Sequence, residues 1–245
     1  MQTHPHGHPI SVVVIPDDYQ ALNIDHFCIS PKYQNFLDSM MIPNGLIKDR
    51  IEKVASEIVE HYERANVQNL TAICVLKGGF RFCADLVDAM ERTIRARGTA
   101  INIKPDFVRI RSYVNASSGD DIALVGVENP QDYKGKDILI IEDIIDTGRT
   151  MKKLHSYLKS LEVKSITDVS LLVKRTPASN GYRPLFAGFE IPDHFVVGYA
   201  LDYNDFFRDL HHICIINTAG MEYFAVPETI AGRLNDAEQQ QKNCS

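Results

Sequence analysis

The chain has 245 residues, of which 44% are hydrophobic and 24% charged, and its 26 basic and 32 acidic side chains give a net charge of −6. This composition is typical of a globular protein and excludes the disordered classes. The acidic balance leaves no general basic field for nucleic acid or an anionic membrane surface, so any phosphate binding must be local. We therefore expect neither nucleic acid nor a membrane among the partners.

Cysteine usage and the lengths of the apolar runs indicate the compartment. No apolar stretch approaches the ~20 residues that cross a bilayer, and the N-terminus lacks the apolar core of a secretion signal. The five cysteines form no close pair and show no metal-ligand spacing, and three lie inside apolar runs, as buried free thiols do. These features predict a cytoplasmic protein. The cysteines are Cys28, Cys74, Cys83, Cys214 and Cys244.

Both ends of the chain are expected to lie outside the domain. We expect residues 1–20 to form a flexible N-terminal tail and residues 227–245 a polar, Gln-rich C-terminal tail, either a surface helix or a loose segment. His4, His6 and His8 alternate in the first tail, which suggests either metal binding or a mobile segment without a ligand, and nothing nearby completes a coordination shell. Residues 21–226 are then expected to form a single domain with a small added lobe.

In chain order, the first element is an amphipathic helix at 44–65, followed by a strand at 71–76 and a second helix. A strand at 106–113 leads into a polar stretch, and the strand at 137–141 precedes a third helix. Two more apolar runs follow at 169–175 and 212–216. The stripe of the second helix consists of Phe82, Leu86, Met90 and Ile94, and that of the third of Met151, Leu154, Leu158 and Leu161.

Near-continuous apolar strands separated by helices are typical of a parallel sheet covered on both faces. We therefore predict an α/β fold with a twisted, mainly parallel sheet flanked by helices. Ligands in such folds bind beyond the carboxyl ends of the strands. The loops expected to carry the site are 77–80, 111–121, 142–150, 174–180 and 202–209.

The loop at 142–150 combines carboxylates with a turn suited to an anion. The turn of Thr147, Gly148, Arg149 and Thr150 lies where a strand hands over to a helix, so its unpaired N–H groups favour a bound phosphate, although the same residues often only cap a helix. The adjacent acids Glu142 and Asp143 repel each other and suit neutral hydroxyls or Mg²⁺ as partners. The loop therefore predicts a clamp for ribose 5-phosphate.

The stretch "ILIIEDIIDTGRT" at 138–150 resembles the signature of the phosphoribosyltransferases that use phosphoribosyl pyrophosphate. Further stretches resemble the hypoxanthine-guanine phosphoribosyltransferases, in the same order, over roughly residues 25–217. They are "CVLKGGF", "RSY", "SLLVKRTP", "GFEIPDHFVVGYALDYND" and "FFRDL". The resemblance implies the type I phosphoribosyltransferase fold, with a small hood lobe built from terminal segments, and a homodimer or homotetramer.

The resemblance also implies the reaction. It is the Mg²⁺-dependent transfer of the 5-phosphoribosyl group from phosphoribosyl pyrophosphate to N9 of hypoxanthine or guanine, which yields IMP or GMP and pyrophosphate in purine salvage. Asp146 is the expected general acid/base, exchanging a proton with N7 of the purine, and it also belongs to the 5-phosphate turn with residues 147–150. The alternative role of Asp146 is a cap for the following helix.

On the purine side, the resemblance implies that Lys174 donates a hydrogen bond to O6, that Phe195 stacks on the base and that the backbone of Val196 contacts its edge. Asp202 resembles an aspartate of this pocket that holds Mg²⁺ on the pyrophosphate side, so the expected metal ligands are Asp202, Glu142 and Asp143. Three of these residues have an alternative role: Lys174 as a solvated lysine, Phe195 as a core residue and Asp202 as a turn former. His194 could tune the pocket, and acceptance of xanthine stays open.

For the pyrophosphate, the resemblance implies backbone contacts from Lys77 and Gly78, often with a cis peptide after Leu76, and an ion pair with Arg208. "KGG" alone is an ordinary turn, and the arginine could instead pair with a neighbouring aspartate, Asp205 or Asp209. The pair Ser112 and Tyr113 is expected to lie on a loop that closes over the reaction centre; the alternative is an exposed hairpin.

Two functions of other classes remain possible from the sequence. Some members of the superfamily sense phosphoribosyl pyrophosphate and regulate transcription, keeping the clamp while losing catalytic parts. Here Asp146, Lys174 and Arg208 are all present, and no DNA-binding extension is seen. An assembly protein of the same fold is the second alternative, and the repelling acids of an intact clamp argue against it.

Overall fold

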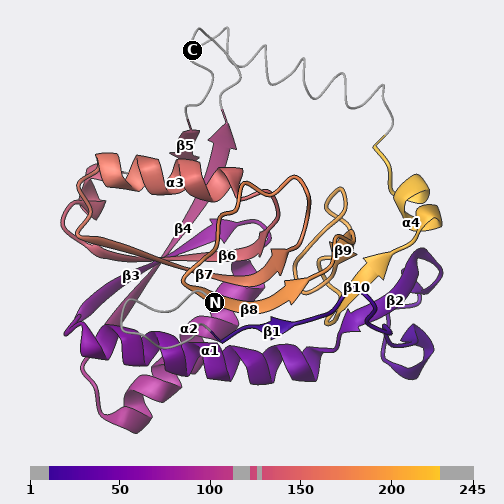
Figure 1. Cartoon of the computed structure of the whole chain (residues 1–245), viewed down its shortest axis with the longest axis horizontal. Helices are drawn as coiled ribbons and strands as arrows, with labels where there is room; N and C mark the ends of the chain where they lie inside the picture. Colours follow the sequence, from indigo (N-terminus) through magenta and orange to yellow (C-terminus); the bar gives the residue numbers. More distant parts are fainter. Residues whose placement is uncertain (1–10, 113–121, 126–128, 227–245) are drawn as a thin grey trace, which may run out of the picture.

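The computed structural model describes residues 11–112, 122–125 and 129–226, and its centre is a seven-stranded sheet (Figure 1). All neighbouring strands in it run parallel except the last pair, which confirms the mainly parallel sheet expected from the sequence. In spatial order the strands are β1 (Val13–Val14), β8 (Phe186–Ile191), β7 (Ser165–Lys174), β6 (Asp137–Ile145), β3 (Asn69–Leu76), β4 (Asn102–Ser112) and β5 (Ile122–Val125).

Helices cover both faces of this sheet (Figure 1). Ile138 and Ile140 of β6 pack in one cluster with α3 (Arg149–Ser160), while Leu139 and Ile141 pack in another with α1 (Asn44–Arg64) and α2 (Phe80–Arg97). Successive side chains of a strand point to opposite faces, so covering both faces requires an unbroken apolar run. The three helices and their apolar stripes lie where the sequence predicted them. No helix of the described ranges is long and apolar enough to span a membrane.

A second, three-stranded antiparallel sheet joins segments from both halves of the chain. The run at 212–216, expected in the main sheet, forms β10 (Ile213–Ile216) here, because it pairs with β2 (Leu37–Ile42) and β9 (Val196–Val197) instead. Around this sheet, aromatic rings of Tyr33, Phe207 and Phe224 form a separate core. That this second sheet and its core form the hood over the substrate stays a prediction. The elements are η1 (Ile24–His26), η2 (Gln34–Phe36), β2 (Leu37–Ile42), β9 (Val196–Val197), β10 (Ile213–Ile216) and α4 (Thr218–Tyr223), while η3 (Pro130–Tyr133) precedes β6.

Two predicted boundaries are corrected. The N-terminal tail does not reach residue 20, because Val13 and Val14 pair with β8 and Ile15 is buried beside them. The strand β6 does not end at residue 141 but continues to Ile145, since its apolar residues still pair with β7. Consequently Glu142, expected in a loop, is held in the strand. The C-terminal tail and residues 1–10 lie outside the described residues.

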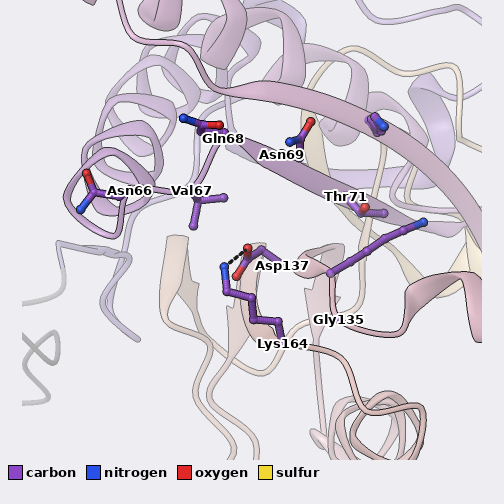
Figure 2. A pocket seen from close by; sticks show the side chains of 10 residues that line it. Asn66, Val67, Gln68, Asn69, Thr71, Gly135, Asp137 and Lys164 are labelled. Atoms are coloured by element: carbon purple, nitrogen blue, oxygen red, sulfur yellow. Dashed lines mark hydrogen bonds and ion pairs between the residues drawn. The ribbon is translucent and has the colours of Figure 1, made fainter.

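A cavity of about 370 Å³ lies at the amino ends of the parallel strands (Figure 2). It is lined by residues such as Asn69, which begins β3, and Asp137, which begins β6 and pairs with Lys164 at 2.7 Å. None of the candidate site residues lines it. Those residues lie at the opposite, carboxyl edge of the sheet, as the rule for parallel sheets predicts.

Candidate active site

The loop after β3 lies directly against the acids of β6. A Cβ atom on Gly78 would stand 1.6 Å from Oδ2 of Asp143, so only glycine lets the backbone come this close. Gly79 is the N-cap residue of α2: its oxygen accepts the N–H of Cys83 at 2.8 Å, and its own N–H donates back to the oxygen of Val75 at 3.1 Å. The peptide between Leu76 and Lys77 is cis, as the resemblance implied. The predicted pyrophosphate loop and the predicted ribose acids are therefore neighbours.

The acid pair at the end of β6 is only partly satisfied. Although Glu142 as a whole is partly exposed, its Oε2 atom is shielded from solvent and has no hydrogen-bond partner within the described ranges. Burial first, and then the neighbouring Asp143, raise the pKa of Glu142 well above its ordinary value. Burial also raises the pKa of Asp143, against its hydrogen bonds and the charge of Arg208. A hydroxyl or a cation would relieve both groups.

The predicted phosphate turn forms the start of α3. Gly148 is its N-cap residue with φ +75° and, as a glycine, has no side chain that could cap the helix. The side chain of Asp146 faces Lys174 and accepts no N–H of the first turn within the described chain, so Asp146 does not serve as a cap. A capping-type bond is present only for Thr147, whose Oγ1 accepts the N–H of Arg149 at 3.4 Å. Arg149 and Thr150 are exposed in the first turn. The turn keeps the unpaired N–H groups that favour an anion.

Lys174 brings a cation to the proposed acid/base. Its Nζ lies 3.5 Å from Oδ2 of Asp146 and 3.9 Å from Oδ1 of Asp193. The lysine side chain is 11% exposed, so the alternative of a solvated lysine is wrong. Asp146 itself is half exposed, which leaves its carboxylate open to a ligand. Asp193 is a neighbour that the sequence did not single out.

Phe195 presents its ring to solvent rather than to the core. Its residue is 43% exposed, and its ring meets Tyr203 edge to face with centroids 5.4 Å apart, so the core alternative is wrong. Val196 is buried in β9 and pairs with Ile215. An exposed aromatic ring directly before the start of β9 is available to stack on a flat ligand. His194 is exposed next to it.

Charged groups on the loop after β9 form one network. Arg208 contacts Asp202 at 2.8 Å and Asp205 at 3.0 Å, while Nζ of Lys77 reaches Asp205 at 2.9 Å. Lys77 first, and then Arg208, lower the pKa of Asp205. The alternative of an Arg208 ion pair with a neighbouring aspartate is thus present for Asp205. It is absent for Asp209, which contacts Lys32 at 2.7 Å instead.

Asp202 also fulfils its alternative role, because its Oδ2 accepts the N–H of Asp205 at 2.7 Å and so closes a turn. Its other oxygen faces Arg208. Turn formation therefore does not consume the whole carboxylate. Of the predicted closing loop, Ser112 ends β4, and Tyr113 lies outside the described residues.

A preformed metal centre is not seen: within the described ranges no group of three His, Cys, Asp or Glu side chains converges. Mg²⁺ does not require one, because it is commonly held by one or two carboxylates, substrate phosphates and water. The unpartnered Oε2 of Glu142 beside Asp143 is a donor set of the hard oxygen type that suits this ion. The residues therefore fit Mg²⁺.

Comparison with known proteins identifies the family. The model of the phosphoribosyl transferase domain matches residues 41–204. The hypoxanthine-guanine phosphoribosyltransferase of Schistosoma mansoni is 55% identical over 89% of this chain and 76% of its own. The chain belongs to this family. The hypoxanthine-guanine phosphoribosyltransferase of Homo sapiens is 47% identical over 85% of this chain and 94% of its own.

A solved structure agrees with this assignment. The crystal structure of hypoxanthine-guanine phosphoribosyltransferase from Schistosoma mansoni in complex with IMP has a TM-score of 0.79 and 52% identity, covering 88% of this chain and 99% of that one. As a member of the hypoxanthine-guanine phosphoribosyltransferase family, the chain is a pentosyltransferase of purine salvage. The alternatives of a transcriptional sensor and of an assembly protein are therefore wrong.

Proposed function

We propose that the chain transfers the 5-phosphoribosyl group from phosphoribosyl pyrophosphate to N9 of hypoxanthine or guanine, giving IMP or GMP and pyrophosphate. One observation carries the proposal. The loop at 77–79, the acids Glu142 and Asp143, and the turn at 147–150 follow one another at the ends of the adjacent strands β3 and β6. The three parts suit an anion, sugar hydroxyls and a second anion, in that order. Pyrophosphate, ribose and 5-phosphate follow one another in the same order in the substrate.

Different residues stabilise the two opposite charges that develop during bond cleavage. As the bond between C1′ and the pyrophosphate oxygen stretches, positive charge builds on the ribose and negative charge on the leaving group. Glu142 and Asp143 hold the ribose hydroxyls and stabilise the first charge. The backbone of residues 77 and 78 and the guanidinium of Arg208 stabilise the second. Asp146 takes the proton of N7 when N9 attacks, and returns it in the reverse direction.

The metal has a defined place in this scheme. Glu142, Asp143 and Asp202 would hold Mg²⁺, and their carboxylate oxygens are the ligand type that it prefers. When bound, Mg²⁺ neutralises charge on the pyrophosphate and orients it for departure. Displacement of Arg208 from Asp202 would free that carboxylate, which is 2.8 Å from the guanidinium.

The purine side sets specificity. Lys174 donates to O6 of hypoxanthine or guanine, whereas adenine presents an amino donor at the same position, which cannot accept that hydrogen bond. Phe195 stacks on the base face, and backbone groups of Val196 contact its edge. The position of Lys174 beside Asp146 supports this assignment, because the purine must meet both residues at once.

We also propose a homodimer or homotetramer in a reducing, cytoplasmic environment. Phe80 and Phe107 are 44% and 50% exposed and border an apolar hollow of about 220 Å³. Exposed apolar side chains gathered around one hollow are typical of a surface that is covered in an oligomer. The four described cysteines are free thiols, which persist in reducing compartments. Light scattering on a size-exclusion column measures the assembly directly.

One assay tests the reaction. The protein is incubated with phosphoribosyl pyrophosphate, Mg²⁺ and, in separate tubes, hypoxanthine, guanine, xanthine or adenine. We expect IMP and GMP, each with an equivalent of pyrophosphate, and no AMP. Failure to form nucleotide from every oxopurine would overturn the proposal. The xanthine tube reports a preference that the contacts around purine C2 decide.

A further inference from the structure

The turn that follows β7 lies over the phosphate turn. A Cβ atom on Gly148 would stand 2.5 Å from Oδ1 of Asn180 and 2.6 Å from Cβ of Tyr182, so the space beside Gly148 is filled by these two residues. The N–H of Asn180 also donates to the oxygen of Thr147 at 2.9 Å. Residues 147 and 148 are therefore fixed from outside α3.

Asn180 links this contact to two further elements. Its Oδ1 accepts the N–H of Tyr182 at 3.0 Å, which fixes the amide in place. Its backbone oxygen accepts Nζ of Lys152, on the first turns of α3, also at 3.0 Å. The turn at 180–182 thus contacts the phosphate turn and the helix behind it at the same time.

The hydroxyl of Tyr182 connects the turn to the body of the protein. It donates to Oδ2 of Asp168 on β7 and lies 2.8 Å from Nε2 of His155 on α3. A phenol has one O–H donor, and here it donates to Asp168, so Nε2 of His155 must donate to the phenol oxygen. Asp168 is 5% exposed, and its Oδ1 accepts the N–H of Leu185 at 3.0 Å. Burial first, and then Asp168, raise the pKa of Tyr182, so the hydroxyl stays protonated.

We propose that Tyr182 is a positioning residue for the 5-phosphate, acting through Asn180 and Gly148 on the turn at 147–150. The inference rests on the proposed function, since it assigns that turn to the 5-phosphate. Backbone N–H groups bind a phosphate well only when the turn is held in its binding geometry before the ligand arrives. The bonds to Asp168 and His155 supply that hold from β7, which pairs with β6 before the turn, and from α3, which begins within it.

Ligand choice separates this role from a general effect on folding. IMP and phosphoribosyl pyrophosphate both carry the 5-phosphate, whereas pyrophosphate does not and binds at the loop of residues 77–79 and Arg208. A looser phosphate turn must weaken the first two ligands and spare the third. A protein that is merely destabilised would show no such split between ligands.

The experiment measures dissociation constants of the three ligands, with Mg²⁺, by titration calorimetry for the wild type and Tyr182→Phe. We expect IMP and phosphoribosyl pyrophosphate to bind about tenfold more weakly, in line with a lost hydrogen bond to a charged group, and pyrophosphate to change less than about twofold. The matched control is Tyr157→Phe, on α3 in the same core cluster. Within the described chain no hydrogen bond joins its hydroxyl to residues 147–150, so all three constants should stay within about twofold.

A second variant, Asn180→Ala, removes the amide over Gly148 and its bond to the N–H of Tyr182, but keeps the hydroxyl bonds of Tyr182 to Asp168 and His155. We expect the same split between ligands. Equal weakening of pyrophosphate in both variants, or unchanged binding of IMP in both, would overturn the inference. A wild type that binds neither IMP nor phosphoribosyl pyrophosphate would instead refute the proposed function.

Discussion

The close approach of the loop after β3 to the acids of β6 yields a prediction for Gly78→Ala. The added Cβ would lie 1.6 Å from Oδ2 and 2.6 Å from Cγ of Asp143. An ordinary carbon–oxygen contact needs about 3.4 Å, so the carboxylate or the loop must move by roughly 1.5 Å or more. Asp143 cannot turn away freely, because its Oδ1 accepts the N–H of Ile144 at 2.8 Å.

The magnitude follows from that displacement. A misplacement of about 1 Å in a positioned group can cost about 100-fold in rate, or ~2.7 kcal/mol. We therefore expect kcat/KM for phosphoribosyl pyrophosphate to fall about 100-fold in Gly78→Ala. Overpacking should also lower the free energy of unfolding by about 1–3 kcal/mol. Gly45→Ala is the control, since a Cβ there meets nothing within 4 Å.

The assay is steady-state formation of IMP at varied phosphoribosyl pyrophosphate, repeated in an Asp143→Ala background. Removing the carboxylate removes the clash, so Gly78→Ala should cost less than about tenfold there, and the two substitutions should be strongly non-additive. If the 100-fold loss persists without the Asp143 carboxylate, the clash is not its cause and the reasoning is refuted.

Two further substitutions test the acid pair and the base pocket. Burial and Asp143 raise the pKa of Glu142 in the folded chain above its ordinary 4.5. Between the unfolded and the folded pKa, the folded chain holds a proton that the unfolded chain has lost. The free energy of unfolding therefore falls as pH rises above about 4.5. Glu142→Gln should therefore gain melting temperature over the wild type at about pH 8 and little at about pH 5; a gain independent of pH would contradict the cause. Lys174→Ala should raise KM for hypoxanthine about 10- to 100-fold, from the loss of a charged hydrogen bond, and KM for phosphoribosyl pyrophosphate less than about threefold. Equal rises would place the lysine elsewhere.

The parts of the fold predicted from sequence are those set by local patterns. The stripe over 44–65 corresponds to α1 (Asn44–Arg64), and the apolar run at 137–141 corresponds to the start of β6. The end of β6 was missed because the charged pair at 142 and 143 suggested a loop, whereas Ile144 and Ile145 still pair with β7. The placement of β10 was missed because pairing with β2 joins segments far apart in the chain.

The candidate site shows the same division. Residue types and spacing identified the acids and the phosphate turn, the resemblance added Lys174, and the comparisons confirm the family that was resembled. Contacts between residues far apart in the chain could not be predicted from the sequence. One example is the contact of Lys77 with Asp205, which are 128 positions apart. Asn180 and Tyr182 were missed too, although "NGY" at 180–182 marks a turn after a strand and could have drawn attention to them.

The central claim is that Asp146 handles the purine proton while its neighbours hold the substrate, and Asp146→Asn tests it most directly. The measurement is the single-turnover rate of IMP formation together with the dissociation constant of phosphoribosyl pyrophosphate. The account predicts a rate lower by about 100-fold or more, with affinity changed less than about threefold. Equal losses in rate and affinity would contradict it and make Asp146 part of the phosphate clamp alone.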